Sequence, residues 1–192
     1  MKLILCDLNL DVYNAFHNYF GHLKDVEIFN QPFQTIKKYD CIVSPANSFG
    51  IMDGGFDYHI TNYFGNGLML NVQNHIIKYY AGEQPVGTSF VIKTGNENHK
   101  YLAHTPTMRT PQIINGSDNV YYAMKAMLIE VKKHEDINSV LCSGLGTLSG
   151  GVPADKAVKQ MYMAYENVIL NPIKHIDWKV AFQRENEIHR LR

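Results

Sequence analysis

Short apolar runs alternate with longer amphipathic segments along the whole chain, and this alternation limits the possible folds more than any other feature. The runs are typical of strands because they are short and several contain β-branched residues. They span residues 2–6, 26–29, 41–44, 89–93, 101–104 and 139–142. Apolar residues three and four positions apart predict helices over residues 11–20, 57–80, 119–134 and 154–171. The pattern predicts the α/β class, as a three-layer α/β/α sandwich around a mixed, largely parallel sheet.

Three of the predicted helices begin at or beside an aspartate, at positions 57, 118 and 155. A carboxylate at a helix start accepts hydrogen bonds from unpaired backbone amides and lies at the positive end of the helix dipole. We therefore expect Asp57, Asp118 and Asp155 to cap these helices.

Charge and hydropathy exclude two classes of partner. The 192 residues include 18 acidic and 18 basic side chains, so the formal net charge is zero. This balance argues against sequence-independent binding to nucleic acid and against binding to anionic membranes. No apolar run approaches the roughly 20 residues of a membrane span, and the first residues lack the features of a signal peptide. We expect one monomeric domain over residues 1–192, in which residues 172–192 form a C-terminal appendage of strand or helix.

Cysteine and histidine usage predicts neither a disulfide framework nor a metal site. Cys6, Cys41 and Cys142 each lie in an apolar stretch, as expected of buried thiols in a reducing compartment. The nine histidines include no HxH or HExxH spacing. We expect no metal ion and no other cofactor.

Two loops rich in Gly and small polar residues each follow a predicted strand and precede a predicted helix. They are SPANSFGIMDGGFD, which begins at the last residue of the strand over residues 41–44, and SGLGTLSGGVP, which follows residues 139–142. Ligands of such folds bind beyond the carboxyl ends of the strands, and loops of this kind present backbone amides to an anion such as phosphate. The second loop has Ser149 where a dinucleotide motif has its third glycine. It also has no lysine for a Walker A motif.

Several motifs in order resemble the macro domain family. DCIVSPANS at residues 40–48 resembles the family's strand and loop D-A-I-V-N-A-A-N-S, and residues 49–65 align with the MacroD-type loop and helix without a gap. Three segments are similar to the NSFGxMDGGxD, PTMRxP and GLGT-xx-GG signatures of a branch associated with phages and bacteria. They are residues 47–57, 106–111 and 144–151. The resemblance covers roughly residues 26–170 and implies the macro domain fold.

The resemblance implies that the partner is ADP-ribose or an ADP-ribosylated macromolecule. The expected activity is hydrolysis of ADP-ribose linkages, either on a macromolecule or in small derivatives such as a 1″-phosphate or an O-acetyl ester. Two alternatives stay open: a reader that binds ADP-ribose without turnover, and a virion or host-interaction component with a divergent pocket. The resemblance places the protein in the cytoplasm, which would be the host's if the gene is viral.

The resemblance also implies the roles of individual residues. Asp57 follows Asn47 by ten positions, as in the paired Asn and Asp of MacroD-type hydrolases, and both are candidate catalytic residues. Asp57 would position or activate water, since one base suffices when a carboxylate leaves the anomeric carbon, or would only cap its helix. Asn47 would hold the distal ribose or only stabilise its turn.

The remaining candidates are expected to bind the substrate. Those in and around the two loops are Ser44, Ala46, Asn47, Ser48, Asp53, Gly54, Gly55, Phe56, Gly144, Gly146, Thr147, Leu148, Ser149 and Gly150. For adenine, Asn30 or Gln31 is nearest in sequence context, with Asp7 as a further candidate. Arg109 would reach a phosphate or tie its loop to the domain. In the family's pattern asparagine stands at the position of Ser44, and glycine at those of Asp53 and Leu148.

Overall fold

The computed structural model describes residues 1–191 and contains a six-stranded sheet in the order β2-β1-β6-β3-β5-β4. The strands are β1 (Lys2–Cys6), β2 (Val26–Phe29), β3 (Cys41–Ser44), β4 (Phe90–Lys93), β5 (Tyr101–His104) and β6 (Ser139–Cys142). All neighbours pair in parallel except β4, which runs antiparallel to β5 at one edge. The predicted mixed, largely parallel sheet is therefore confirmed.

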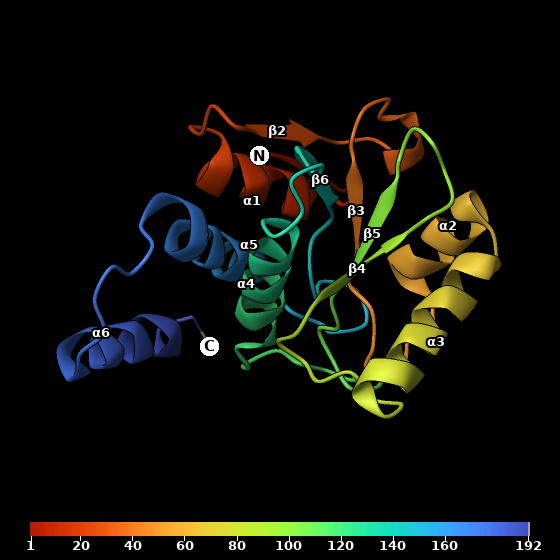
Figure 1. Ribbon diagram of the computed structural model, residues 1–192. Coiled ribbons are helices and arrows are strands. Elements are labelled where there is room, and N and C mark those ends of the chain that lie inside the picture. The colour runs from red at the N-terminus through yellow and green to blue at the C-terminus, as the bar shows by residue number, and fades with distance from the viewer. Residues whose placement is uncertain (192) are drawn as a thin grey trace.

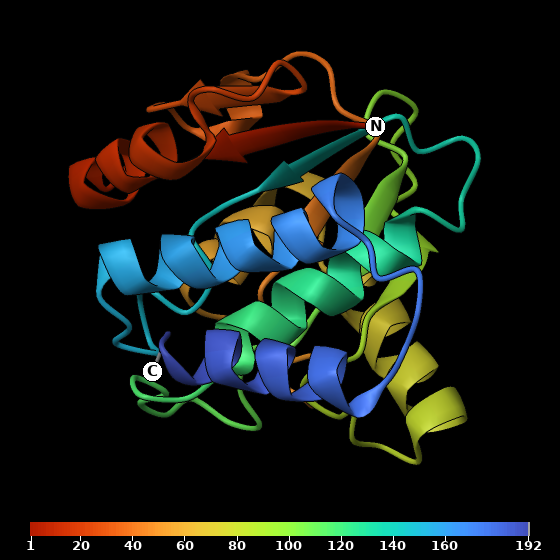
Figure 2. The same ribbon diagram turned by 90° about the vertical axis from the view of Figure 1, so that its left-hand side faces the viewer.

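Helices cover both faces of this sheet. They are α1 (Leu10–Phe20), α2 (Gly55–Phe64), α3 (Gly67–Tyr80), α4 (Asn119–Val131), α5 (Ala154–Tyr165) and α6 (Trp178–His189), with short turns η1 (Phe33–Thr35) and η2 (Glu166–Leu170). Helices α1, α4 and α5 lie on one side of the sheet and α2 and α3 on the other (Figure 1). Helix α6 runs outside this sandwich, alongside α4 (Figure 2). None of the helices in residues 1–191 has both the length and the apolar character needed to cross a membrane.

The central strands are apolar on both faces because both faces are buried. In β1, Leu3 and Leu5 pack into the cluster beneath α1, α4 and α5, while Ile4 and Cys6 pack into the cluster beneath α2 and α3. The side chains of a strand alternate between its two faces, so one short strand contributes to two cores. This double burial fixes the register of the sheet and, with it, the positions of the loops at the strand ends.

Two of the predicted helical segments differ from the structure. The segment 57–80 forms two helices, since Gly65 adopts a φ of +92° and ends α2 before α3 begins. The segment 154–171 ends in a π-helical turn, η2. The C-terminal appendage is the helix α6, and Arg192 lies outside the described residues.

The prediction that three aspartates cap their helices is wrong. Helix α2 begins after Gly54, and Asp57 is its third residue, with a carboxylate that accepts a hydrogen bond from Ser44. Asp118 precedes α4 but its side chain makes no capping hydrogen bond. Helix α5 begins after Pro153, which places Asp155 within the first turn. The first amides of α2 consequently have no side-chain cap.

Candidate functional site

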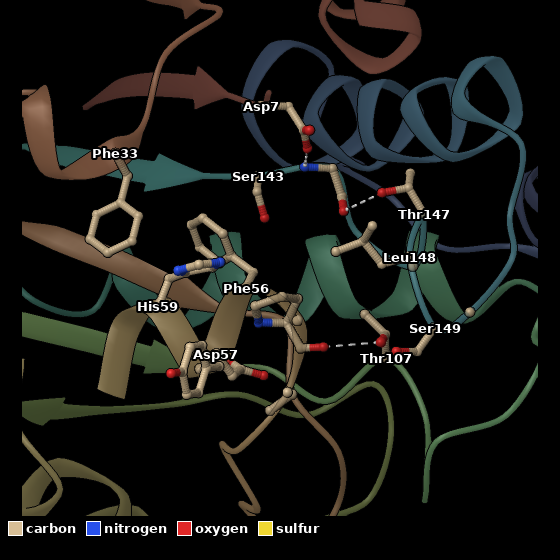
Figure 3. A pocket seen from close by; sticks show the side chains of 18 of the residues that line it. Asp7, Phe33, Phe56, Asp57, His59, Thr107, Ser143, Thr147, Leu148 and Ser149 are labelled. Carbon is tan, nitrogen blue, oxygen red and sulfur yellow. Dashed lines mark hydrogen bonds between the residues drawn. The ribbon is translucent and has the colours of Figure 1, made fainter. Parts of the chain in front are cut away.

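A cleft of about 900 Å³ opens where three neighbouring strands end. The carboxyl ends of β1, β6 and β3 contribute Cys6, Ser143 and Pro45 to its lining. The two Gly-rich loops form its walls, as Figure 3 shows for the side chains of Phe56 and Leu148. The cleft thus lies at the sheet edge where the sequence predicts a ligand.

The first loop supplies a row of unpaired donors. The backbone amides of Gly54, Gly55 and Phe56 donate to no other group in the described part of the chain, because they belong to the uncapped start of α2. Gly55 adopts a φ of +55°, a conformation that favours glycine. These amides combine with the positive end of the helix dipole to form a site for an anion.

Asn47 gives the first loop its shape. Its side-chain oxygen accepts hydrogen bonds from the amides of Phe49 and Ile51, and its Nδ2 donates to the carbonyl of Ile51 at 2.7 Å. The amide of Ser48 lies 3.1 Å from the carbonyl of Met108, which joins the loop to the segment 106–111. Asn47 therefore stabilises its turn and also lines the cleft.

The second loop is folded on itself and leaves its middle amides unpaired. Val152 donates to the carbonyl of Gly146 at 3.1 Å, and Ile114 donates to that of Gly150 at 2.8 Å. The carboxylate of Asp7 fixes the start of the loop by accepting the amide of Gly144 at 3.0 Å. The amides of residues 147–150 donate to no group within residues 1–191.

The two loops face one another across the cleft. A Cβ atom added to Gly55 would lie 3.7 Å from Cδ1 of Leu148. In Figure 3, Phe33 and Phe56 lie on one side of the cavity, and Leu148 and Ser149 lie on the other. Two sets of unpaired amides thus bound one space, which suits a diphosphate.

The charges around the cleft are mainly negative. Among the described residues that line it, Asp7, Asp53 and Asp57 are acidic, and none is lysine or arginine. The charge of a bound phosphate would therefore be met by backbone dipoles and neutral polar side chains, and by no lysine or arginine of the described lining.

Asp57 is the buried carboxyl group of the site. It is 7% exposed, and Ser44 Oγ donates a hydrogen bond to its Oδ1 at 2.6 Å. Burial raises the pKa of Asp57 from 3.8 to about 7, although the hydroxyl of Ser44 opposes this rise. A carboxyl group with such a pKa can accept a proton from water near neutral pH.

Most of the predicted site residues line the cleft. They are Asp7, Gln31, Ala46, Asn47, Asp53, Gly54, Gly55, Phe56, Asp57, Gly144, Gly146, Thr147, Leu148, Ser149 and Gly150. Four predicted residues do not line it. Ser44 lies behind Asp57, Ser48 is buried in its loop, and Asn30 donates to the carbonyl of Asp7. Arg109 pairs with Glu83 through Nε at 2.6 Å, so it ties its loop to the loop between α3 and β4.

Sequence reasoning missed several residues of the lining. Phe33 packs edge-on against Phe56 with ring centroids 5.3 Å apart, and Thr107 donates to the carbonyl of Pro45. Ser143 comes directly after β6, which is the one signal that could have identified it. Thr107 lies in the segment 106–111, where the PTMRxP signature could have identified it, whereas Phe33 carried no such signal because a contact between distant segments brings it to the cleft.

The histidine next to the site has no direct role in the cleft. His104 ends β5, is fully buried, and contacts Oε1 of Gln84 through Nδ1 at 2.6 Å. Burial lowers its pKa to about 3, so the ring is neutral. Within residues 1–191, no cluster of three or more His, Cys, Asp or Glu side chains could hold a metal ion.

Comparison with known proteins identifies relatives of this chain. The model of the Macro domain family matches residues 43–161. An uncharacterized protein of Aquifex aeolicus is 32% identical over 122 residues, which cover 64% of this chain and 70% of the relative.

Solved structures share the fold at low sequence identity. A macrodomain of Oceanobacillus iheyensis, solved with ADP, superimposes with a TM-score of 0.61 at 17% identity over 81% of this chain and 87% of that one. DarTG of Thermosipho africanus, solved in complex with ADP-ribose, gives a TM-score of 0.56 at 15% identity over 74% of this chain and 40% of that one. The fold, the cleft and the family match agree, and this chain belongs to the macro domain family.

Proposed function

We propose that this macro domain binds ADP-ribose in the cleft and hydrolyses the bond between the distal ribose and an acceptor. The observation that carries the proposal is the pair of facing loops whose amides have no partner. Their donors match the oxygens of a diphosphate. The complexes of other macrodomains with ADP and ADP-ribose support the choice of ligand. The segments 47–57 and 106–111 support placing the chain in the branch with the NSFGxMDGGxD and PTMRxP signatures.

The proposed ligand lies along the cleft with its diphosphate between the two loops. The adenine lies toward the aromatic side, near Phe33 and Phe56, where Gln31 is the predicted polar residue that also lines the cleft. The distal ribose then lies toward Asn47 and Asp57. This direction brings the anomeric carbon to the only buried carboxyl group in the described lining.

The proposed reaction uses Asp57 as a general base. The carboxylate takes a proton from a water molecule, whose oxygen attacks the anomeric carbon as the bond to the acceptor breaks. An ester-linked acceptor leaves as a carboxylate and needs no separate acid, which suits a site with a single buried carboxyl group. Asp53 is exposed and its side chain is not held near Asp57 by any hydrogen bond within residues 1–191.

A titration followed by a turnover assay tests the proposal. Calorimetry with free ADP-ribose is expected to show saturable binding, and an ester-linked ADP-ribosyl peptide is expected to release ADP-ribose. Absence of both binding and a thermal shift would reject the ligand. Binding without turnover of ester, 1″-phosphate or acetyl substrates would identify a reader.

A further inference from the structure

Ser44 and Asp57 form a buried pair that joins the sheet to the wall of the cleft. Ser44 is the last residue of β3 and is fully buried, and its hydroxyl donates to Asp57 Oδ1 at 2.6 Å. Asp57 lies in the first turn of α2, and the little surface it exposes belongs to the cleft lining. One carboxylate oxygen is thus held by the sheet. The other makes no hydrogen bond with a described protein group.

Few other groups affect the charge of this carboxyl group. From β5, His104 lies beside Ser44 in the parallel register, but it is neutral because burial holds its pKa at about 3. On α2 and the loop before it, His59 and Asp53 are exposed to solvent. The titratable side chains of α3 are His75, which stacks on Phe90, the exposed Lys78 and Tyr79, and the half-buried Tyr80. The influences that shift the pKa of Asp57 are its burial, which raises it, and the hydroxyl of Ser44, which lowers it.

We propose that Ser44 is a positioning residue for the hydrolysis, because its hydroxyl favours the ionised form of Asp57 and turns the second carboxylate oxygen toward the distal ribose. This inference rests on the proposed function. A hydroxyl that donates to a carboxylate stabilises its charged form. Without the donor, the buried carboxyl group would be protonated at neutral pH and would be unable to accept a proton from water.

The hydrogen bond between Ser44 and Asp57 also affects the anion site at the start of α2. The backbone amides of Gly55 and Phe56, at the start of the same helix, have no side-chain cap and are free to bind a ligand. A carboxylate that capped its own helix would compete with the ligand for these amides. The hydrogen bond to Ser44 draws Asp57 away from them, so one contact serves both the base and the anion site.

The decisive variant is Ser44→Ala, measured by the pH dependence of kcat/KM on an ester-linked ADP-ribosyl substrate. Loss of the donor is expected to move the acidic limb of the profile upward by about one pH unit, which is about a fivefold loss at pH 7 and about a tenfold loss well below it. Activity is expected to recover toward the wild-type value by about pH 9. The affinity for free ADP-ribose should stay within about twofold, since Ser44 does not line the cleft.

Two further variants separate this role from a loss of packing. Ser44→Thr keeps the hydroxyl and is expected to keep the wild-type midpoint. Ser139→Ala removes another serine that donates to an aspartate, at 2.9 Å to Asp40 Oδ2, at the opposite end of the same sheet. It should leave the midpoint unchanged. A Ser44→Ala profile that falls equally at every pH would overturn the proposal.

A second measurement distinguishes failure of this inference from failure of the proposed function. Carbon-13 NMR follows the titration of the Asp57 carboxyl group in the free protein and needs no turnover. The titration midpoint is expected to rise in Ser44→Ala and not in Ser139→Ala. If the wild type hydrolyses nothing but the midpoint rises, the proposed reaction fails while the control of the charge by Ser44 stands. If the midpoint does not move, the inference fails whether or not the protein is a hydrolase.

Discussion

At the scale of single residues, the cleft depends on backbone atoms more than on side chains. The described lining offers the amides of both loops to a ligand, while its charged side chains are mostly acidic. Such a site is sensitive to what a substitution adds, since an added side chain can block access to an amide. It is less sensitive to what a substitution removes.

Substitution of Gly54 tests whether the unpaired amides of the first loop bind the ligand. An added Cβ atom there meets no atom within 4 Å, and its φ of −140° is extended backbone that other residues adopt. We expect Gly54→Val to weaken ADP-ribose binding by at least about tenfold, because the isopropyl group blocks donors that each contribute about 1.5–3 kcal/mol to a charged partner. Calorimetry measures the affinity. Gly67→Val, at the start of α3 and outside the cleft, is the matched control and should bind normally.

Substitution of Asp57 distinguishes a hydrolase from a protein that binds ADP-ribose without turnover. Asp57→Asn keeps the acceptor for Ser44 but loses the negative charge and the basicity. We expect release of ADP-ribose from an ester-linked substrate to fall by at least about 100-fold. The affinity for ADP-ribose should stay equal or improve, because a negative charge near the diphosphate is removed. Turnover by Asp57→Asn at the wild-type rate would point to Asp53 or to the substrate's own phosphate.

At the scale of elements, the two loops differ in how they tolerate change. The second loop is closely packed: a Cβ atom on Gly150 would lie 2.5 Å from the carbonyl oxygen of Gly146. A β-branched residue there would disturb the loop before it affected the ligand. The first loop has open space at Gly54 and is braced from outside by the segment 106–111.

Arg109 lies in the segment 106–111, which supports the first loop, and does not line the ligand site. Its guanidinium pairs with Glu83 through two hydrogen bonds and lies 5.5 Å from the ring centroid of Phe49, all on the exposed side of the loop. We expect Glu83→Gln to leave the melting temperature nearly unchanged, because both partners of this ion pair are exposed to solvent. The affinity for ADP-ribose should remain within about twofold. A clear gain of affinity with an unchanged melting temperature would show that the released Arg109 reaches the phosphate.

The strands and the binding loops could be predicted from the sequence, but one helix boundary could not. All six strands follow from short apolar runs, and the binding loops follow from Gly-rich segments after two of them. The break at Gly65 could not be predicted from the spacing, because apolar residues continue at every fourth position across it, at Ile60, Phe64, Leu68, Val72 and Ile76. The spacing of apolar residues shows which face of a helix is buried. It does not show whether one helix or two consecutive helices form that face.

The missed features of the cleft are those that depend on distant contacts. The local sequence predicts that Asp57 caps a helix, because it lies near a helix start. In the structure Asp57 instead accepts a hydrogen bond from Ser44, a strand residue thirteen positions earlier. Phe33 reaches the aromatic side of the cleft only because η1 packs against α2. Periodicity and local propensity contain no information about either contact.

At the scale of the whole molecule, the buried carboxyl group lowers stability as the pH rises. The pKa of Asp57 is about 7 in the folded protein against an ordinary value of 3.8. The folded state therefore binds the proton more tightly than the unfolded state. The contribution of this group to stability is fully present below pH 3.8 and is lost as the pH rises through 7.

The stability difference between Asp57→Asn and wild type should consequently depend on pH. We expect the two proteins to be similar near pH 4 and the variant to become more stable between pH 4 and 7, by up to about 4 kcal/mol, with no further gain above. Chemical denaturation at several pH values measures the difference. The neutral ring of His104 acts in the opposite direction, since its lowered pKa destabilises the fold in acid, but it is common to both proteins and cancels. A difference that is constant with pH would show that the carboxyl group is ionised throughout.

The absence of a fixed cation from the described lining also has a consequence for how fast a ligand arrives. A cleft lined with lysine or arginine attracts an anion from a distance, and salt slows that encounter. Here the net charge of the chain is zero and backbone dipoles act only at short range. The acidic side chains of the lining instead repel an anion, so the association rate of the ligand should rise with ionic strength as salt screens them.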